Sequence, residues 1–241
     1  MAEAARLFLD ALGYSVADRA LVEPLSLQLP LEGCTVILGP NGAGKSTLLQ
    51  LIHGMLEGQT GCVRISSGTA EPRPVTPGEL ALVLQRPVML SRSVQANVEH
   101  ALAVRGVPRR DRAALASRSL ARVGLSAFAT RFAQSLSGGE QQRLAIARVI
   151  ACSPLGLLLD EPCGSLDPGA TAAIEVLLIE LAATGMGVVM TTHDLAQARR
   201  LASRVVFIHQ GQILEVSAAS AFFNSPQTDL ARRFLAGELI G

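Results

Sequence analysis

The sequence of 241 residues predicts an α/β fold whose sheet is mainly parallel. Short apolar runs without polar alternation are typical of strands covered on both faces, and here they alternate with segments of helical periodicity. The apolar runs predict strands at 35–38, 80–84, 157–159, 188–190 and 205–208. The periodic segments predict helices at 45–53, 109–123, 139–151, 171–183 and 195–202. This length suffices to bury a core, in one large domain or two small ones.

Two stretches between these elements have a different character. Residues 86–152 contain little strand signal and predict a mainly helical insertion between two strands of the sheet. The Pro- and Gly-containing stretch 68–78 predicts a loop rather than a linker between domains.

Composition excludes several classes of protein. The 21 basic and 20 acidic residues leave a net charge of +1, so no basic field covers the whole domain to hold nucleic acid. Aromatic residues make up 3% of the chain, which disfavours base-stacking platforms. No apolar run approaches the roughly 20 residues that span a bilayer. The four cysteines lie far apart with no C-x-x-C pair, which favours a reduced, cytosolic protein.

The first chemical motif follows the predicted strand 35–38 and opens the predicted helix 45–53. Glycines let a backbone wrap closely around phosphate oxygens, Lys45 would reach the outer phosphates, and Ser46 would ligate Mg²⁺. A chance glycine-rich turn is the alternative, but strand, loop and helix occur in the required order. The loop therefore predicts nucleotide binding without choosing among kinases, GTPases and ATPases. Its residues are Gly39, Pro40, Asn41, Gly42, Ala43, Gly44, Lys45, Ser46 and Thr47.

Adjacent carboxylates end the predicted strand 157–159. Asp160 and Glu161 stand where open α/β sheets place their ligands, at the carboxyl end of a parallel strand. Asp160 would hold the Mg²⁺ shell, and Glu161 would polarise the attacking water. An ordinary acidic turn is the alternative, which the phosphate loop makes the weaker interpretation.

Residues 136–143 first indicate a helix start, with Ser137 as N-cap and Glu140 completing a capping box. The capping box does not explain Gly138 and Gly139, because glycine is costly in the first turn of a helix. A helix terminus that closely approaches an anion would explain both glycines.

With these motifs, nearly the whole chain resembles the ATP-binding cassette ATPases, the nucleotide-binding subunits of ABC transporters. The motifs occur in the family order. They are the Walker A loop at 39–47, the Q-loop glutamine Gln85, the signature sequence at 136–140, the Walker B strand 157–160 with Glu161, the D-loop at 165–167 and the switch histidine His193.

The resemblance implies an enzyme that converts ATP and water to ADP and phosphate, with Mg²⁺ as cofactor. It implies a single ABC ATPase domain over 1–241, with a RecA-like nucleotide-binding core at 1–85 and 153–241. The core would include an antiparallel β subdomain near the N-terminus, and residues 86–152 would form a helical subdomain. Two copies would sandwich two ATP molecules head to tail. The residues that it assigns to ATP besides the phosphate loop are Tyr14, which would stack on adenine, together with Ser137, Gly138, Gly139, Glu140 and Asp167. Lys45, Gln85, Glu161 and His193 would act in catalysis, and Ser46, Gln85 and Asp160 would ligate the metal.

The resemblance also favours transport. Val88, Met89 and Leu90 would form an apolar patch in an exposed linker, and in the family this region receives a helix of the membrane subunit. Two permease subunits would dock near Gln85 to Arg92, with an extracytoplasmic binding protein as an indirect partner. The ATPase would lie on the cytoplasmic face of the plasma membrane.

The cargo is indicated less specifically. Residues 83–90, 192–201 and 234–239 are most similar to ATPases of tungstate-type oxyanion importers, near the phosphate branch. Import of phosphate or molybdate, a single-cassette exporter and a non-transport ABC ATPase remain as alternatives.

Overall fold

The computed structural model describes residues 5–238, which build two sheets. The larger sheet has the order β10-β9-β3-β8-β7-β6, and all its neighbours are parallel except β10 and β9. Its register sets Leu38 opposite Thr192, and Leu159 opposite Met190. The carboxyl ends of β3, β7 and β8 therefore lie at one edge. The strands are β3 (Cys34–Leu38), β6 (Leu80–Val83), β7 (Gly156–Leu159), β8 (Gly187–Thr192), β9 (Arg204–His209) and β10 (Gln212–Ala218).

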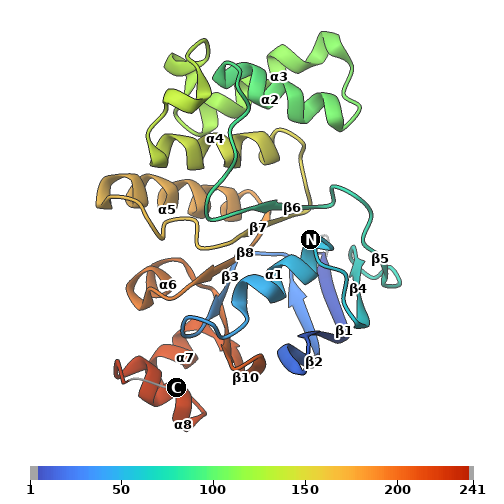
Figure 1. Ribbon diagram of the computed structural model, residues 1–241, viewed down its shortest axis with the longest axis vertical. Helices are drawn as coiled ribbons and strands as arrows, with labels where there is room; N and C mark the ends of the chain where they lie inside the picture. Colours follow the sequence, from blue (N-terminus) through green and yellow to red (C-terminus); the bar gives the residue numbers. More distant parts are fainter. Residues whose placement is uncertain (1–4, 239–241) are drawn as a thin grey trace.

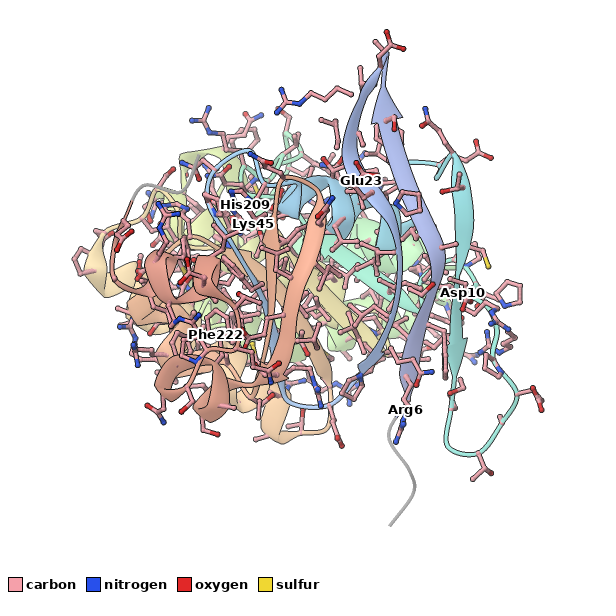
Figure 2. All side chains as sticks on the ribbon, turned by 90° about the horizontal axis from the view of Figure 1, so that it is seen from below. Arg6, Asp10, Glu23, Lys45, His209 and Phe222 are labelled. Carbon is pink, nitrogen blue, oxygen red and sulfur yellow. The ribbon has the colours of Figure 1, made fainter. Side chains whose placement is uncertain are left out.

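A smaller antiparallel sheet of order β2-β1-β4-β5 forms a separate layer beside the parallel sheet (Figure 2). Asp10 on β1 binds Arg64 of β4 on the outer face, with an Nε to Oδ2 distance of 2.8 Å. The strands are β1 (Arg6–Val16), β2 (Arg19–Pro30), β4 (Thr60–Ser66) and β5 (Arg73–Pro74).

Two buried cores cover the two faces of the parallel sheet. Along β3, Val36 and Leu38 belong to one core and Ile37 to the other, as the two-residue period of a strand requires. The core around Ile37 lies between the sheet, the antiparallel layer and α1 (Lys45–His53). The opposite core contains residues of α4 (Gly138–Ile150), α5 (Pro168–Ala183) and α6 (Leu195–Leu201). The continuous apolar strands of the sequence are thus buried on both sides.

The remaining helices lie at the two ends of the molecule (Figure 1). Helices α2 (Val94–Val104) and α3 (Arg109–Arg122) sit with α4 at one end, farthest from the C-terminal helices α7 (Ala219–Asn224) and α8 (Asp229–Leu235). No helix within residues 5–238 is long and apolar enough to cross a bilayer.

The α/β fold class predicted from the sequence is confirmed, and most predicted elements match within a few residues. The predicted helix at 45–53 coincides with α1, and the predicted strand at 205–208 lies inside β9. The predicted loop at 68–78 contains the two-residue strand β5, which adds to the edge of the antiparallel sheet.

The prediction of an exposed apolar patch at 88–90 is wrong in part. The Val88 side chain is 76% exposed, but Met89 is only 7% exposed and joins the core that contains α4. The segment is fastened to the helices, because Arg148 donates to the Val88 carbonyl (2.7 Å) and Leu90 N–H donates to Asn97 Oδ1 (3.0 Å). These bonds direct Met89 inward and leave Val88 as the strongly exposed apolar side chain of this segment.

Glu79 supports the entry into β6, and its role predicts a pH effect on stability. Its carboxylate accepts bonds from the Arg73 guanidinium (Nη1 to Oε2, 2.9 Å) and from the Thr76 N–H (2.7 Å). The Arg73 bonds are the main cause that lowers the pKa of Glu79 from 4.5 to about 2. A depressed folded-state pKa stabilises the fold above pH 4.5, and this contribution disappears as the pH falls toward 2.

We therefore expect Glu79→Gln to lower the free energy of unfolding by about 1 kcal/mol at pH 7. The difference from the parent should vanish near pH 2, as measured by urea unfolding across that range. The exposed Glu57 provides the matched control, because Glu57→Gln should change little at any pH. A pH-independent loss in Glu79→Gln would contradict the assignment.

Candidate functional site

The phosphate loop passes close to two other backbone segments, and two glycines permit this. A Cβ on Gly39 would lie 2.1 Å from the Ile208 carbonyl oxygen. Gly44 has a φ of +99°, and a Cβ there would lie 2.4 Å from the Leu21 carbonyl oxygen. Side chains at either position would push the loop off β2 and β9.

Lys45 begins α1 and is almost buried, with 5% of its side chain exposed. Its Nζ donates to the carbonyls of Gly39 (2.8 Å) and Pro40 (2.9 Å), and lies 3.8 Å from Glu161 Oε1. Burial lowers the pKa of Lys45, and the charges of Glu161 and Asp160 oppose that shift. The ammonium group is therefore held inside the loop, where it can turn from the carbonyls toward an entering phosphate.

Asp160 is fixed by hydroxyl groups from two other elements. Ser46 Oγ donates to Asp160 Oδ1 at 2.8 Å, and Thr191 Oγ1 on β8 donates to the same oxygen at 2.7 Å. The Thr191 hydroxyl also accepts the Glu161 N–H at 2.9 Å. One threonine thus sets the position of both acidic residues.

Glu161 and His193 face each other across neighbouring loops. Glu161 has a left-handed backbone, with a φ of +41°, and its Oε1 lies 3.1 Å from His193 Nδ1. This contact requires a hydrogen on Nδ1 when the carboxylate is ionised. Non-glycine residues in this conformation are a form of strain that clusters at functional sites.

A cavity of about 540 Å³ joins these groups. It brings together most residues predicted from the phosphate loop with Gln85, Glu161 and His193. Leu21 and Gly164 also line it, and the sequence analysis did not include them. A Cβ on Gly164 would lie 3.0 Å from Gln85 Nε2 and 3.2 Å from Glu161 Oε2, so this glycine leaves room for both side chains. The lining residues are Leu21, Asn41, Gly42, Gly44, Lys45, Ser46, Thr47, Gln85, Glu161, Gly164 and His193.

Other predicted site residues lie outside this cavity. Tyr14 is half-buried on β1 and packs against the core beneath the antiparallel sheet. Asp167 caps α5 by accepting the Ala170 N–H at 3.0 Å. The four residues 137–140 are not in the lining either.

The predicted capping box at the start of α4 is confirmed. Ser137 accepts the Glu140 N–H, and the Glu140 carboxylate accepts the Ser137 N–H at 2.7 Å. That backbone bond is the main cause that lowers the pKa of Glu140. A Cβ on Gly139 would lie 2.5 Å from the Ala170 Cβ, so close packing of α4 on α5 is a further reason for this glycine. Gly138 is exposed, and the expected approach of both glycines to an anion stays a prediction.

The oxygen donors at the cavity suit a hard divalent cation such as Mg²⁺. Ser46 and Gln85 line the cavity. Asp160 is not in the lining, but its Oδ1 lies 2.8 Å from the Ser46 hydroxyl. These three side chains are the ones predicted to ligate the metal, and their chemistry fits the ion.

An ion pair behind the site, between the buried Glu175 and the exposed Arg200, was not predicted. Glu175 on α5 accepts two bonds of 2.7 Å from the guanidinium of Arg200 on α6, and a third of 3.3 Å from Gln197. Since α6 begins two residues after His193, this pair also restrains the loop that carries the histidine.

A glycine loop around a buried lysine, with acidic residues at the next strand end, defines a P-loop nucleoside triphosphatase. A family model described as "ABC transporter" matches residues 22–164. The chain belongs to the ABC transporter family, and it is an ATPase whose activity is coupled to transport.

Relatives and solved structures agree with this assignment. "Phosphate import ATP-binding protein PstB 2" of Natronomonas pharaonis is 35% identical over 92% of this chain and 83% of its own length. "Glutamate/aspartate import ATP-binding protein GltL" of Escherichia coli K12 is 37% identical over 83% and 86%. The solved structure of cbiO1 from Clostridium perfringens, described as part of the ABC transporter complex cbiONQ, has a TM-score of 0.80 at 25% identity. That match covers 98% of this chain and all of the other.

Proposed function

We propose that the chain is the ATP-hydrolysing subunit of an importer and works as a head-to-tail pair of identical copies. The observation that carries the pairing is the composition of the nucleotide cavity. It contains the phosphate loop, Gln85, Glu161 and His193, but none of residues 137–140. A second copy would supply Ser137, Gly138 and Gly139 to the same ATP, so that ATP closes the pair and its hydrolysis releases it.

Within each site, the residues divide the work of phosphoryl transfer. Lys45 binds the outer phosphates, and Glu161 accepts a hydrogen bond from the attacking water. The water oxygen forms a bond to the γ-phosphorus while the bond to the leaving ADP oxygen breaks, and the water proton passes toward Glu161. The contact between His193 Nδ1 and Glu161 supports a role for the histidine in holding this carboxylate, and His193 would also bond the γ-phosphate. Bound Mg²⁺, held by Ser46, Asp160 and Gln85, would supply charge neutralisation on the phosphates.

The other parts of the chain would connect the site to the membrane. We assign 1–85 and 153–241 to the nucleotide-binding core and 86–152 to a helical subdomain. The exposed Val88 and the segment from Gln85 to Arg92 would contact two permease subunits at the cytoplasmic face of the plasma membrane. Tyr14 would stack on adenine, and Glu140 and Asp167 would complete the ATP site.

The cargo that we propose is an oxyanion, with tungstate first and phosphate or molybdate as alternatives. The similarity to the phosphate importer ATPase supports this class, as does a 34% identity to a "Probable anion import ATP-binding protein" of Haloferax volcanii over 98% of this chain. The glutamate relative keeps amino-acid import as a competing cargo.

The test is to purify the chain from its native membranes in mild detergent and identify the proteins that accompany it. ATP hydrolysis of that complex is then measured with its binding protein and tungstate, molybdate, phosphate or glutamate. Stimulation by tungstate alone supports the specific proposal, and stimulation by glutamate contradicts the oxyanion class. A complex without a permease would overturn the importer and favour a non-transport ATPase. The same complex carrying Glu161→Gln provides the background rate.

A further inference from the structure

Charge is divided unevenly along this nearly neutral chain. Residues 86–152 contain eleven arginines and three acidic residues, whereas the rest of the chain contains ten basic and seventeen acidic residues. The basic segment includes α2, α3 and α4, which lie together at one end of the molecule (Figure 1). The protein therefore has one strongly basic end and an acidic remainder, which the net charge of +1 conceals.

Helix α3 concentrates this charge on its surface. It buries Ala116, Ser119 and Leu120 and leaves four arginines exposed. Its acidic residue, Asp111, lies 3.7 Å from Arg110 in an exposed pair. Within residues 5–238, no ion pair neutralises the other three exposed arginines of the helix. The exposed arginines are Arg109, Arg110, Arg118 and Arg122.

A cavity of about 360 Å³ lies between α2 and α3 and is lined by arginine side chains. Arg92, Arg109 and Arg112 contribute to its wall together with His100, and Glu99 is the acidic residue there. Arg112 is oriented by an Nε bond of 2.8 Å to the Val107 carbonyl. Three arginines at the wall of a space of this size suit a phosphate group, since a guanidinium can bind phosphate with two parallel hydrogen bonds.

We propose that α3 and this cavity form a basic surface that binds the phosphate headgroups of anionic phospholipids. The inference rests on the proposed function, which places the chain beside a membrane. Arg110, Arg118 and Arg122 fall within about 120° of one another around a helix of 14 residues, about 20 Å long, and Arg109 lines the cavity. Charge spread over this length matches several headgroups better than one small ligand. Val104 is 73% exposed at the end of α2, where an apolar side chain suits the boundary of a bilayer.

The same features disfavour the other polyanions. Phe128 and Phe132 of this segment do not line the arginine cavity, where His100 is the aromatic ring, so the cavity offers little for nucleic-acid bases to stack on. The apolar residues that line the cavity are all alanines, so the cavity has no large apolar surface against which a side chain of an acidic peptide could pack. The acidic remainder of the chain would be repelled by an anionic leaflet, so the basic end would turn toward the membrane. Val88 and the proposed permease contact lie in the same basic segment.

The test measures flotation of the full chain with vesicles, in the absence of any permease. The vesicles are phosphatidylcholine alone, or phosphatidylcholine mixed with phosphatidylglycerol, at low and high salt. We expect binding only to the anionic vesicles, with a steep loss in high salt. Replacing Arg109, Arg110, Arg118 and Arg122 together by glutamine should weaken that binding about a hundredfold. Glutamine keeps the helix, since its helix propensity is close to that of arginine.

A matched control removes the same charge elsewhere, by replacing the exposed Arg19, Arg199, Arg232 and Arg233 with glutamine. This control should retain vesicle binding, and both variants should retain ATP hydrolysis. Equal binding to neutral vesicles, or an unchanged affinity in the α3 variant, would overturn the inference. So would preferential binding of RNA or of an acidic peptide from the permease. If the vesicles are not bound but the purified complex contains a permease, only this inference fails. If the vesicles are bound but no permease is found in the purified complex, the proposed importer function is overturned and the proposed lipid-binding surface is retained.

Discussion

Glu161→Gln is expected to lower ATP turnover by about 10²–10⁴-fold while ATP binding persists. The amide keeps the size of the side chain but cannot take a proton from water. The phosphate loop, Lys45 and Asp160 are untouched by this change, so the contacts proposed to bind the nucleotide should survive. Since hydrolysis is what would release the paired copies, the variant should remain dimeric in ATP.

Two measurements together check this expectation. Phosphate release gives the turnover, and light scattering with ATP and with ADP gives the mass of the particle. Glu180→Gln is the matched control, because Glu180 lies exposed on α5 away from the cavity, and this variant should behave as the parent. Unchanged turnover in Glu161→Gln would remove Glu161 as the base. A monomer in ATP would contradict the proposed pairing.

The central part of the fold could be predicted from the sequence because its signals are local. Successive residues of a strand in the parallel sheet point into the two cores in turn, so every position is buried. Such a strand is therefore visible in the sequence as a continuous apolar run. Helix α2 and strand β4 were not predicted individually, since each depends on its packing partners more than on its own pattern. The outcome at Met89 has the same origin, because the bond that Arg148 donates to Val88 and the bond that Asn97 accepts from Leu90 decide which side chain of that segment turns inward.

The candidate site divides in a similar way. Contiguous motifs pointed to Lys45, Asp160 and Glu161. The structure gathers Lys45 and Glu161 with Gln85 and His193 around one cavity, and Asp160 is bonded to Ser46 of the same lining. The role of Thr191 was missed, because the sequence does not state that β8 lies next to β7. Once β7 and β8 are known to be neighbours, the contact can be predicted. The Thr191 hydroxyl near the end of β8 then lies beside Asp160, which follows β7.

The most direct test of the phosphate loop uses an unusual feature of composition, since Lys45 is the only lysine among 241 residues. Lys45→Ala removes a buried ammonium group that would bond the outer phosphates. Hydrogen bonds to charged groups contribute about 1.5–3 kcal/mol each, so ATP should bind about 10–100-fold more weakly. The loss should be smaller for AMP, which lacks the outer phosphates. Equilibrium binding of a fluorescent ATP analogue, displaced by ATP or AMP, measures both affinities.

Chemical labelling of the parent gives an independent measurement. An amine-reactive reagent can modify only Lys45 and the amino terminus. Mass spectrometry separates the two labelled peptides, so the peptide that contains Lys45 reports on the phosphate loop. Because the Lys45 ammonium would face the phosphates of bound ATP, ATP should protect this lysine and leave labelling of the amino terminus unchanged. Arg73→Ala serves as the control, since it removes a positive charge from a residue that does not line the cavity and should keep full affinity. Undiminished affinity in Lys45→Ala, or labelling of Lys45 that ATP does not slow, would contradict the assignment of this loop to ATP.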